Sequence, residues 1–266
     1  MLSYQHMYHA GGLADVHKHV LLARALTYLT RNPAPLIYVE THSGRGRYFL
    51  NSPPAQKTGE AAAGIERLLA EHLIASKEPF LRVLKAIRQG NKRIYGGSPL
   101  LAATLLRPQD RLWLWELHPR EYGWLQRLFA NNRRVSVYHG DGMEGALEKL
   151  PPASSDPGTG LVLVDPSYEV KAEYEGLPVF VRRLRTRWPQ AAGILWYPML
   201  PARRHEAMRA TLEAEHPDIR VNEMIWGLPS KQRGLFGSAL AYWNLDGAHM
   251  DMPSFQAPSI GKGTSV

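Results

Sequence analysis

The sequence predicts an α/β protein built on a doubly wound sheet. Short apolar runs rich in β-branched and aromatic residues alternate with segments in which apolar residues recur at helical spacing. One such helix is expected over 14–29, before the turn at 32–35. The expected strands are 36–39, 112–117, 135–138, 161–164, 193–197, 219–226 and 239–245. This alternation is typical of a mostly parallel sheet covered by helices on both faces.

The last two expected strands have no helical segment between them. Only the glycine- and proline-containing stretch 227–234 separates them, so they should form an antiparallel hairpin at one edge of the sheet. Seven strands that end in such a hairpin are the plan of the class I, Rossmann-like methyltransferases that use S-adenosylmethionine.

The chain is expected to carry an inserted unit between the first two strands. A glycine-containing loop follows the first strand at 40–46. About 65 residues lie between this glycine loop and the second strand, whereas a crossover needs only about a dozen. Helical spacing over 61–75 and 78–89 predicts a helical insertion subdomain at 50–97, within a core formed by 1–49 and 98–248. Ser98 is expected to be the N-cap of the helix over 100–106. The Pro-, Gly- and Ser-rich stretch 249–266 is expected to be a flexible tail.

The composition indicates an anionic partner and excludes several chemistries. The 266 residues carry a formal net charge of +8, which suits nucleic acid, and contain no cysteine. Disulfides, thiolate metal sites and a cysteine nucleophile, including one for C5 methylation of a pyrimidine, are thereby excluded. No apolar run approaches the roughly 20 residues of a membrane-spanning helix and no signal peptide is evident, so we expect a cytoplasmic protein without a membrane partner.

Polar residues follow four of the expected strands, at the sheet edge where ligands bind. They are Glu40, His42, Gly44 and Gly46; then Glu116 and His118; then Asp141 and Gly142; then Asp165-Pro166-Ser167-Tyr168. The glycine fingerprint of a dehydrogenase is absent, which disfavours a pyrophosphate cofactor. S-adenosylmethionine fits better, because Glu116 could accept hydrogen bonds from its ribose hydroxyls and Asp141 from its adenine amine. Each carboxylate could also be a solvated strand end.

The segment 165–168 points to methylation of the exocyclic N6 amine of adenine. That nitrogen is a poor nucleophile because its lone pair is delocalised into the ring. The Asp165 carboxylate and the Pro166 carbonyl could accept hydrogen bonds from its two N–H groups. Tyr168 offers a flat face for a base extruded from its stack. In isolation, the same residues could form an ordinary Asp-Pro turn beside a surface tyrosine.

Several segments resemble the bacterial RlmJ family, whose members methylate N6 of an adenine in 23S ribosomal RNA. They are MLSYQH at 1–6, HAGGLADVHKH at 9–19, THSGRGRY at 41–48, GSPL at 97–100 and LWYP at 195–198, and the likeness extends over about residues 1–245. It implies S-adenosylmethionine contacts at His19, His42, Ser98, Glu116, Asp141 and Gly142, a catalytic acceptor at Asp165 and a substrate contact at Tyr4.

The remaining site assignments follow from the same blocks. We add Gly44 and Asp165 to the cofactor contacts, and we assign His6, Lys18 and Tyr168 with Tyr4 to the substrate. Pro166, Tyr168 and Tyr4 complete the catalytic set. The family usually has a second proline where this chain has Ser167, so a more flexible loop and reduced activity are expected. The tail also departs from the family pattern.

Three further expectations concern metals, charge and packing. His17 and His19 should point to different sides of a helix, and no ligand set is complete, so no metal is expected. Trp196 and Met199 are expected in the core. Basic clusters could line an RNA path, although each alone could be a solvated helix face; they are 82–93, 182–187, 203–204 and the pair Lys231 and Arg233.

We therefore predict a monomeric 23S ribosomal RNA adenine-N6 methyltransferase. Two alternatives stay open at this point. A DNA adenine-N6 methyltransferase would use the same local chemistry, and an RNA-binding protein of the same fold could have lost catalytic power.

Overall fold

The computed structural model describes residues 5–152, 159–227 and 234–256. Its main feature is a seven-stranded sheet in the order β5-β4-β1-β6-β7-β9-β8. The strands are β1 (Leu36–Glu40), β4 (Arg111–Glu116), β5 (Val135–His139), β6 (Thr159–Val164), β7 (Ala192–Met199), β8 (Arg220–Ile225) and β9 (Gly237–Trp243).

Five strands are parallel, and β9 runs antiparallel to both β7 and β8. The predicted edge hairpin and fold class are confirmed. The strand order reverses between β1 and β6, so a ligand crevice is expected beyond the carboxyl ends of these two strands. Both strands are almost wholly apolar because helices cover both of their faces.

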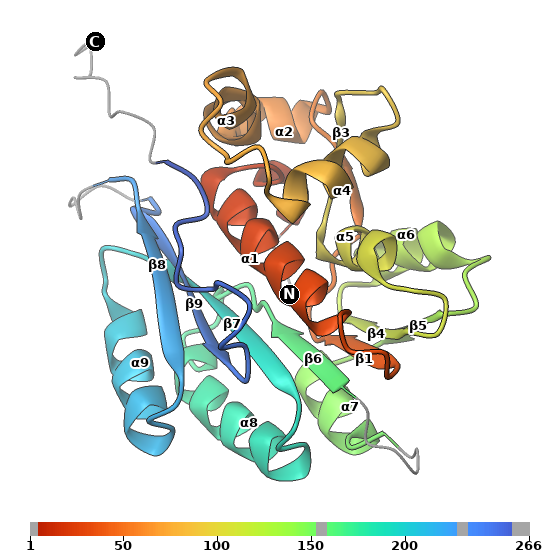
Figure 1. The fold of residues 1–266 in the computed structure, drawn as a ribbon. Helices are drawn as coiled ribbons and strands as arrows, with labels where there is room; N and C mark the ends of the chain where they lie inside the picture. Colours follow the sequence, from red (N-terminus) through yellow and green to blue (C-terminus); the bar gives the residue numbers. More distant parts are fainter. Residues whose placement is uncertain (1–4, 153–158, 228–233, 257–266) are drawn as a thin grey trace.

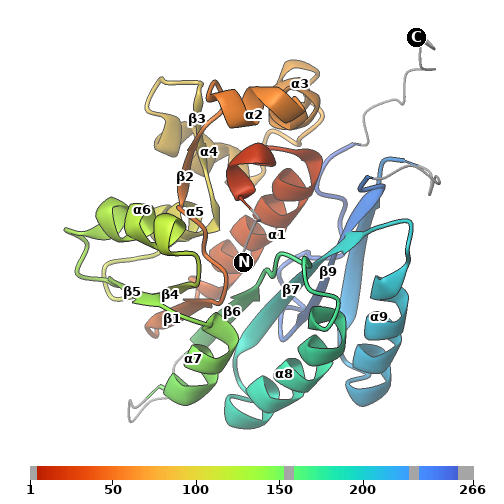
Figure 2. The same cartoon turned by 180° about the vertical axis from the view of Figure 1, so that it is seen from behind.

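Helices cover the two faces of the sheet in separate groups (Figure 1). One face carries α1 (Leu13–Leu29), α5 (Ser98–Leu105) and α6 (Pro119–Phe129), and the other carries α7 (Gly142–Lys149), α8 (Glu173–Arg187) and α9 (Arg204–Glu215), as the reverse view also shows (Figure 2). Most residues of α1 are buried, since this helix lies between the sheet and the segment that follows β1. No helix of the described part is long and apolar enough to span a bilayer.

The segment between β1 and α5 contains short helices and a two-stranded antiparallel sheet, whose strands flank those helices in the sequence. These elements are β2 (Arg47–Phe49), α2 (Pro53–Thr58), η2 (Ala62–Glu66), α3 (Arg67–Ala70), α4 (Pro79–Arg88) and β3 (Ile94–Gly96). Apolar residues such as Ile65, Leu68 and Phe80 belong to the same buried cluster as Val20 and Leu21 of α1. The insertion and the core therefore share one continuous apolar interior, and a boundary at 50–97 stays a prediction.

The helix expected over 61–75 is shorter and interrupted. Gly64 has non-helical angles (φ −96°, ψ −112°), and the Ile65 N–H donates to the Gly11 carbonyl at 2.8 Å. A Cβ at position 64 would lie 2.3 Å from that carbonyl oxygen, so only glycine fits this close approach. The N-terminal segment is thus fixed against the insertion by a backbone contact that interrupts the helix.

Two sequence expectations about chain ends and caps need correction. The N-cap of α5 is Gly97, and the Ser98 hydroxyl instead donates to Glu40 Oε1.

Residues 249–256 are packed against the core. Met250 and Phe255 are buried, and the Arg24 guanidinium donates to the carbonyls of His249, Met252 and Pro253. The buried Arg24 supplies the donors that hold this segment in place, while 257–266 lie outside the described residues.

Candidate active site

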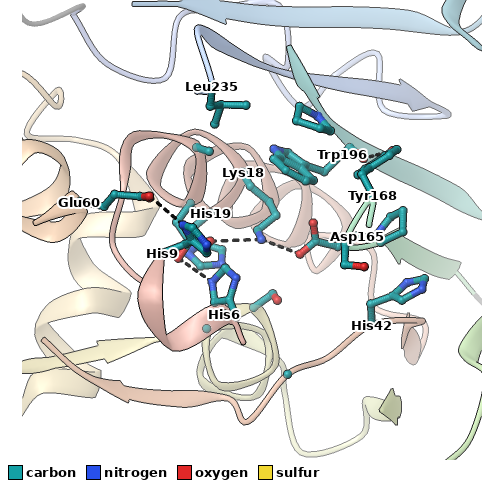
Figure 3. A pocket seen from close by; sticks show the side chains of 18 of the residues that line it. His6, His9, Lys18, His19, His42, Glu60, Asp165, Tyr168, Trp196 and Leu235 are labelled. Carbon is teal, nitrogen blue, oxygen red and sulfur yellow. Dashed lines mark hydrogen bonds and ion pairs between the residues drawn. The ribbon is translucent and has the colours of Figure 1, made fainter. Parts of the chain in front are cut away.

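A cavity of about 660 Å³ lies beyond the carboxyl ends of β1, β4 and β6. Its walls come from the N-terminal turn η1 (His6–Tyr8), the start of α1, the glycine loop after β1, and the loops after β6 and β7 (Figure 3). This position is the one expected where the strand order reverses.

The cavity brings together most of the side chains that the sequence assigns to the site. The residues that line it are His6, Lys18, His19, His42, Gly44, Ser98, Glu116, Asp165, Pro166 and Tyr168. Asp141 and Gly142 are not among its lining residues, and Tyr4 lies outside the described residues.

Asp165 and Lys18 form a buried ion pair in the cavity wall. The Lys18 Nζ donates to Asp165 Oδ2 at 2.6 Å and also lies 3.2 Å from Oδ1 of Asp15, one turn earlier on α1. The same Asp15 accepts from the Gly11 N–H at 3.0 Å and lies 2.9 Å from His6 Nε2. A continuous polar chain therefore runs from His6 through Asp15 and Lys18 to Asp165, as Figure 3 shows in part.

Lys18 is charged despite its burial. Burial alone would lower its pKa, but the carboxylates of Asp165 and Asp15 outweigh that effect and raise the pKa above its ordinary value. The ammonium also lies 5.6 Å from the ring centre of Trp196, within range of a cation–π interaction.

Tyr168 is anchored at the rim of the cavity. Its hydroxyl donates to the Trp196 carbonyl at 2.7 Å, and its ring packs edge-on against the Trp196 ring at 5.8 Å. Tyr168 adopts φ +58°, a left-handed conformation that is uncommon for a non-glycine residue. The preceding Ser167 only weakly caps the loop, by accepting from the Glu169 N–H at 3.5 Å.

Glu40 lies beneath the cavity and is completely buried. It accepts hydrogen bonds from Ser98 Oγ and from Tyr38 Oη, the latter at 2.9 Å. Burial raises the pKa of Glu40 to about 8, although both hydrogen bonds favour the charged form. This carboxyl group fixes the Ser98 hydroxyl at the cavity wall.

Glu116 is held by two backbone amides, one on each oxygen. Gly44 N–H donates to Oε2 and His118 N–H to Oε1, both at 2.7 Å. A carboxylate has about four acceptor positions, so two remain for the hydroxyls of a ribose. The geometry is compatible with the role that the sequence assigns to Glu116.

Asp141 and Gly142 have structural roles that the sequence did not reveal. Asp141 is the N-cap of α7, and its Oδ1 accepts from the N–H groups of Met143 and Glu144 at 2.8 and 3.1 Å. A Cβ at position 142 would lie 1.9 Å from the Thr41 carbonyl oxygen, so glycine is required there. Oδ2 of Asp141 keeps acceptor capacity for a ligand.

His19 presents an unpartnered polar atom at the cavity wall. Its Nδ1 lies 2.8 Å from Tyr95 Oη, whereas its Nε2 is buried without a protein partner. Burial lowers its pKa to about 3, so the ring is neutral.

On the other side of α1, His17 contacts Ser238 and Asn222, both at 2.9 Å, so the two histidines point to different sides of the helix as predicted. His42, whose pKa is lowered by burial, lies 2.7 Å from Thr41 Oγ1.

A polar ligand such as S-adenosylmethionine fits this donor set. The orphaned Nε2 of His19, the remaining acceptor positions of Glu116 and the fixed Ser98 hydroxyl all offer hydrogen bonds at one cavity. Within the described residues, no three His, Cys, Asp or Glu side chains are arranged to hold a metal ion.

Three residues of this site were missed or misplaced at the sequence level. Trp196 was expected in the core but lines the cavity, while its Nε1 donates to Ser238 Oγ at 2.8 Å. Asp15 and Glu40 are buried carboxyl groups. Asp15 contacts residues within nine positions of it, whereas Glu40 also accepts from Ser98, 58 positions later. The one available signal was the placement of Asp15 three residues before Lys18 on the same helix, which predicts a contact between them.

Comparisons with known proteins agree on one family. The family model described as RsmJ, Ribosomal RNA large subunit methyltransferase D, RlmJ, matches residues 33–261. The Escherichia coli (strain K12) protein named Ribosomal RNA large subunit methyltransferase J is 40% identical over 216 residues, covering 80% of this chain and 76% of the relative. The Haemophilus influenzae protein of the same name is 37% identical over 248 residues, covering 92% and 87%.

A crystal structure from Legionella pneumophila also matches, with a TM-score of 0.79 and 35% identity over 89% of this chain and 87% of that one. The predicted resemblance and the prediction of an enzyme are therefore confirmed. This chain belongs to the RlmJ family of ribosomal RNA large subunit methyltransferases.

Proposed function

We propose that this protein transfers a methyl group from S-adenosylmethionine to the N6 amine of an adenine in 23S ribosomal RNA. The observation that carries the proposal is the position of Asp165-Pro166-Ser167-Tyr168 at the carboxyl end of β6, where Asp165, Pro166 and Tyr168 face one cavity. The names of the two bacterial relatives support ribosomal RNA as the substrate.

Asp165 is the acceptor for the amine in this proposal. Lys18 occupies Oδ2 of Asp165, which leaves Oδ1 available for one N6 hydrogen, while the Pro166 carbonyl can accept the other. Two acceptors direct the nitrogen lone pair out of conjugation with the ring. As the bond between N6 and the transferred methyl carbon forms, the amine loses a proton to Asp165.

Bound S-adenosylmethionine supplies a methyl group on a sulfonium, whose sulfur leaves as a neutral thioether. The protein's part is to hold this methyl donor in position. The cofactor side of the cavity is lined by His19, His42, Gly44, Ser98 and Glu116, and Asp141 is not among the lining residues. Holding the methyl donor and the amine in line supplies much of the rate.

Tyr168 and Trp196 form an aromatic corner against which a base extruded from the RNA can pack. His6, on the N-terminal turn, faces the same cavity, and we assign it with Tyr4 to the substrate. The net charge of +8 favours association with RNA phosphates. A monomeric and cytoplasmic enzyme stays a prediction.

The test is methyl transfer from labelled S-adenosylmethionine to protein-free 23S ribosomal RNA, with nucleosides identified by mass spectrometry. We expect N6-methyladenosine from the wild type and none from Asp165→Ala. Methylation of duplex DNA in preference to RNA would favour the DNA methyltransferase alternative. Failure to bind S-adenosylmethionine in calorimetry would favour an inert RNA-binding protein.

A further inference from the structure

We propose that Asp15 is a positioning residue for methyl transfer: it holds the Lys18 ammonium, and through it Asp165, in the geometry that receives the adenine amine. The inference rests on the proposed function of Asp165. It assigns to Asp15 a role that neither the sequence patterns nor the relatives' names indicate.

The first argument is the geometry of the shared ammonium. An ammonium has three N–H donors, and two of those of Lys18 are used by Asp165 Oδ2 at 2.6 Å and Asp15 Oδ1 at 3.2 Å. A flexible lysine side chain bound by one carboxylate can rotate about that contact. Two carboxylates on opposite sides fix the direction of the remaining N–H and the plane of the Asp165 carboxylate.

The second argument is that Asp15 is itself fixed. It is 3% exposed, lies in the first turn of α1, accepts from the Gly11 N–H and contacts His6 Nε2. Gly11 is in turn fixed to the insertion through its carbonyl, which accepts from the Ile65 N–H. Asp15 is therefore held in place by the backbone contact between Gly11 and Ile65. It binds the Lys18 ammonium, which in turn contacts Asp165.

The third argument concerns charge. Asp15, Lys18 and Asp165 together carry one net negative charge, whereas Lys18 and Asp165 alone are neutral. Without Asp15 the ammonium would be bound by Asp165 alone, in competition with the N6 hydrogen for the same carboxylate. The rate of the chemical step should then fall more than RNA binding does.

The test compares Asp15→Asn with a matched buried carboxylate, Asp110→Asn. Asp110 is also fully buried, also accepts a backbone N–H at 2.8 Å (from Leu36), and also pairs with a basic residue three positions away, Arg107, at 2.9 Å. It precedes β4 at the end of the sheet away from the cavity, so its loss should affect stability alone.

For Asp15→Asn we expect kcat at saturating RNA to fall about 10- to 100-fold, with a smaller change in KM for RNA. Asp110→Asn should keep wild-type kcat at a temperature where thermal unfolding shows both variants folded. If Asp15→Asn does not fold, Asp15→Ser gives the same test, because its hydroxyl can still accept from Gly11 N–H without carrying charge.

A double-mutant cycle with Lys18→Met separates positioning from a general structural role. If Asp15 acts through Lys18, Asp15→Asn should lower kcat by less than about twofold in the Lys18→Met background. Wild-type kcat in folded Asp15→Asn, or an equal loss in both backgrounds, would overturn the inference.

Asp165→Ala in the same assay distinguishes this failure from failure of the proposed function. Continued formation of N6-methyladenosine by Asp165→Ala would refute the acceptor role and the inference with it. An inactive Asp165→Ala beside a fully active Asp15→Asn would refute the positioning role alone.

Discussion

Nζ of Lys18 lies 2.6 Å from Oδ2 of Asp165, and the two side chains are only 5% and 13% exposed. The loop after β6 is thereby bound to the first turns of α1, 147 residues earlier in the chain. An ion pair this buried stabilises the fold only while both partners are present.

Replacing Lys18 with methionine should therefore destabilise the protein as well as lower its kcat to a reduced but measurable value. Two buried carboxylates lose their cation, which costs about 3–5 kcal/mol of unfolding free energy. The loss should shrink as the pH falls, because protonation removes the uncompensated charges. Denaturant unfolding across pH measures both effects, and a stability loss that does not vary with pH would contradict this explanation.

Tyr95→Phe should weaken binding of S-adenosylmethionine. Tyr95 Oη lies 2.8 Å from His19 Nδ1, and it fixes the ring whose Nε2 is unpartnered at the cavity. Removing the hydroxyl should raise the Kd about 2- to 10-fold, the equivalent of one hydrogen bond of about 0.5–1.5 kcal/mol.

Calorimetry measures this change, and Tyr122→Phe is the matched control. Tyr122 stacks on His139 at 4.7 Å and does not line the cavity. Equal affinities of the Tyr95→Phe variant and the wild type would remove His19 from the cofactor site.

Glu40→Gln should change how stability depends on pH. Burial raises the pKa of Glu40 from 4.5 to about 8, so between these values the folded protein binds more protons than the unfolded chain. This contribution to stability is fully present below about pH 4.5 and is lost as the pH rises to about 8.

The glutamine introduced by this substitution carries no titratable group. Its amide oxygen can accept from one of the two hydroxyls of Ser98 and Tyr38, and its amide nitrogen can donate to the other. The thermal midpoint of Glu40→Gln relative to wild type should therefore rise between about pH 5 and pH 8. A constant difference over this range would mean that Glu40 titrates near its ordinary pKa in the folded protein.

Charge reversal on the insertion should weaken RNA binding without changing the chemical step. Lys92 and Arg93 are exposed, whereas Arg88 donates to the Ile94 carbonyl at 3.1 Å and so has a structural role. Lys92→Glu with Arg93→Glu should raise the Kd for RNA and reduce the slope of log Kd against log salt by about 1–2.

Arg133→Glu is the control for this variant, because Arg133 is exposed in the turn before β5, at the end of the sheet away from the cavity. An unchanged salt slope in the double variant would exclude these two residues from the RNA path. The other basic clusters would then be tested in the same way, with Lys231 and Arg233 lying outside the described residues.

Ser167→Pro should show whether serine limits the rate. Proline would restrict the loop before Tyr168 and remove only a weak cap to Glu169 N–H at 3.5 Å. We expect unchanged or higher kcat and about 0.4–1 kcal/mol of added stability. A tenfold fall in kcat would show that the serine conformation is needed.

The strands and the cavity position could be predicted from the sequence because both follow from local patterns. Buried parallel strands such as β1 and β6 are continuous apolar runs, and the residues after them lie at the ligand edge by topology alone. The break at Gly64 could not be predicted, because its cause is the carbonyl of Gly11, more than fifty positions earlier. We predict Asp141 as a ligand from its position after β5, and the structure adds that it is the N-cap of α7.

The packing of 249–256 was also hidden, since the composition there is typical of loops. The guanidinium of Arg24 and the side-chain amide of Asn222 donate to carbonyls of this segment, and nothing in the local sequence of the partners indicates these contacts. Arg24 is thus a buried charged residue whose role only the tertiary structure reveals.

The contacts of Arg24 also have a consequence for biosynthesis. The carbonyls that this guanidinium requires belong to residues made 225 to 229 positions later, so α1 cannot complete its buried hydrogen bonds while the ribosome is still translating the sheet. Until then the guanidinium of Arg24 is paired with Glu78 but lacks its three carbonyl acceptors. The cavity wall that α1 forms should therefore reach its final packing only after synthesis of β9, and a nascent chain stalled before residue 249 should be a preferred client of chaperones.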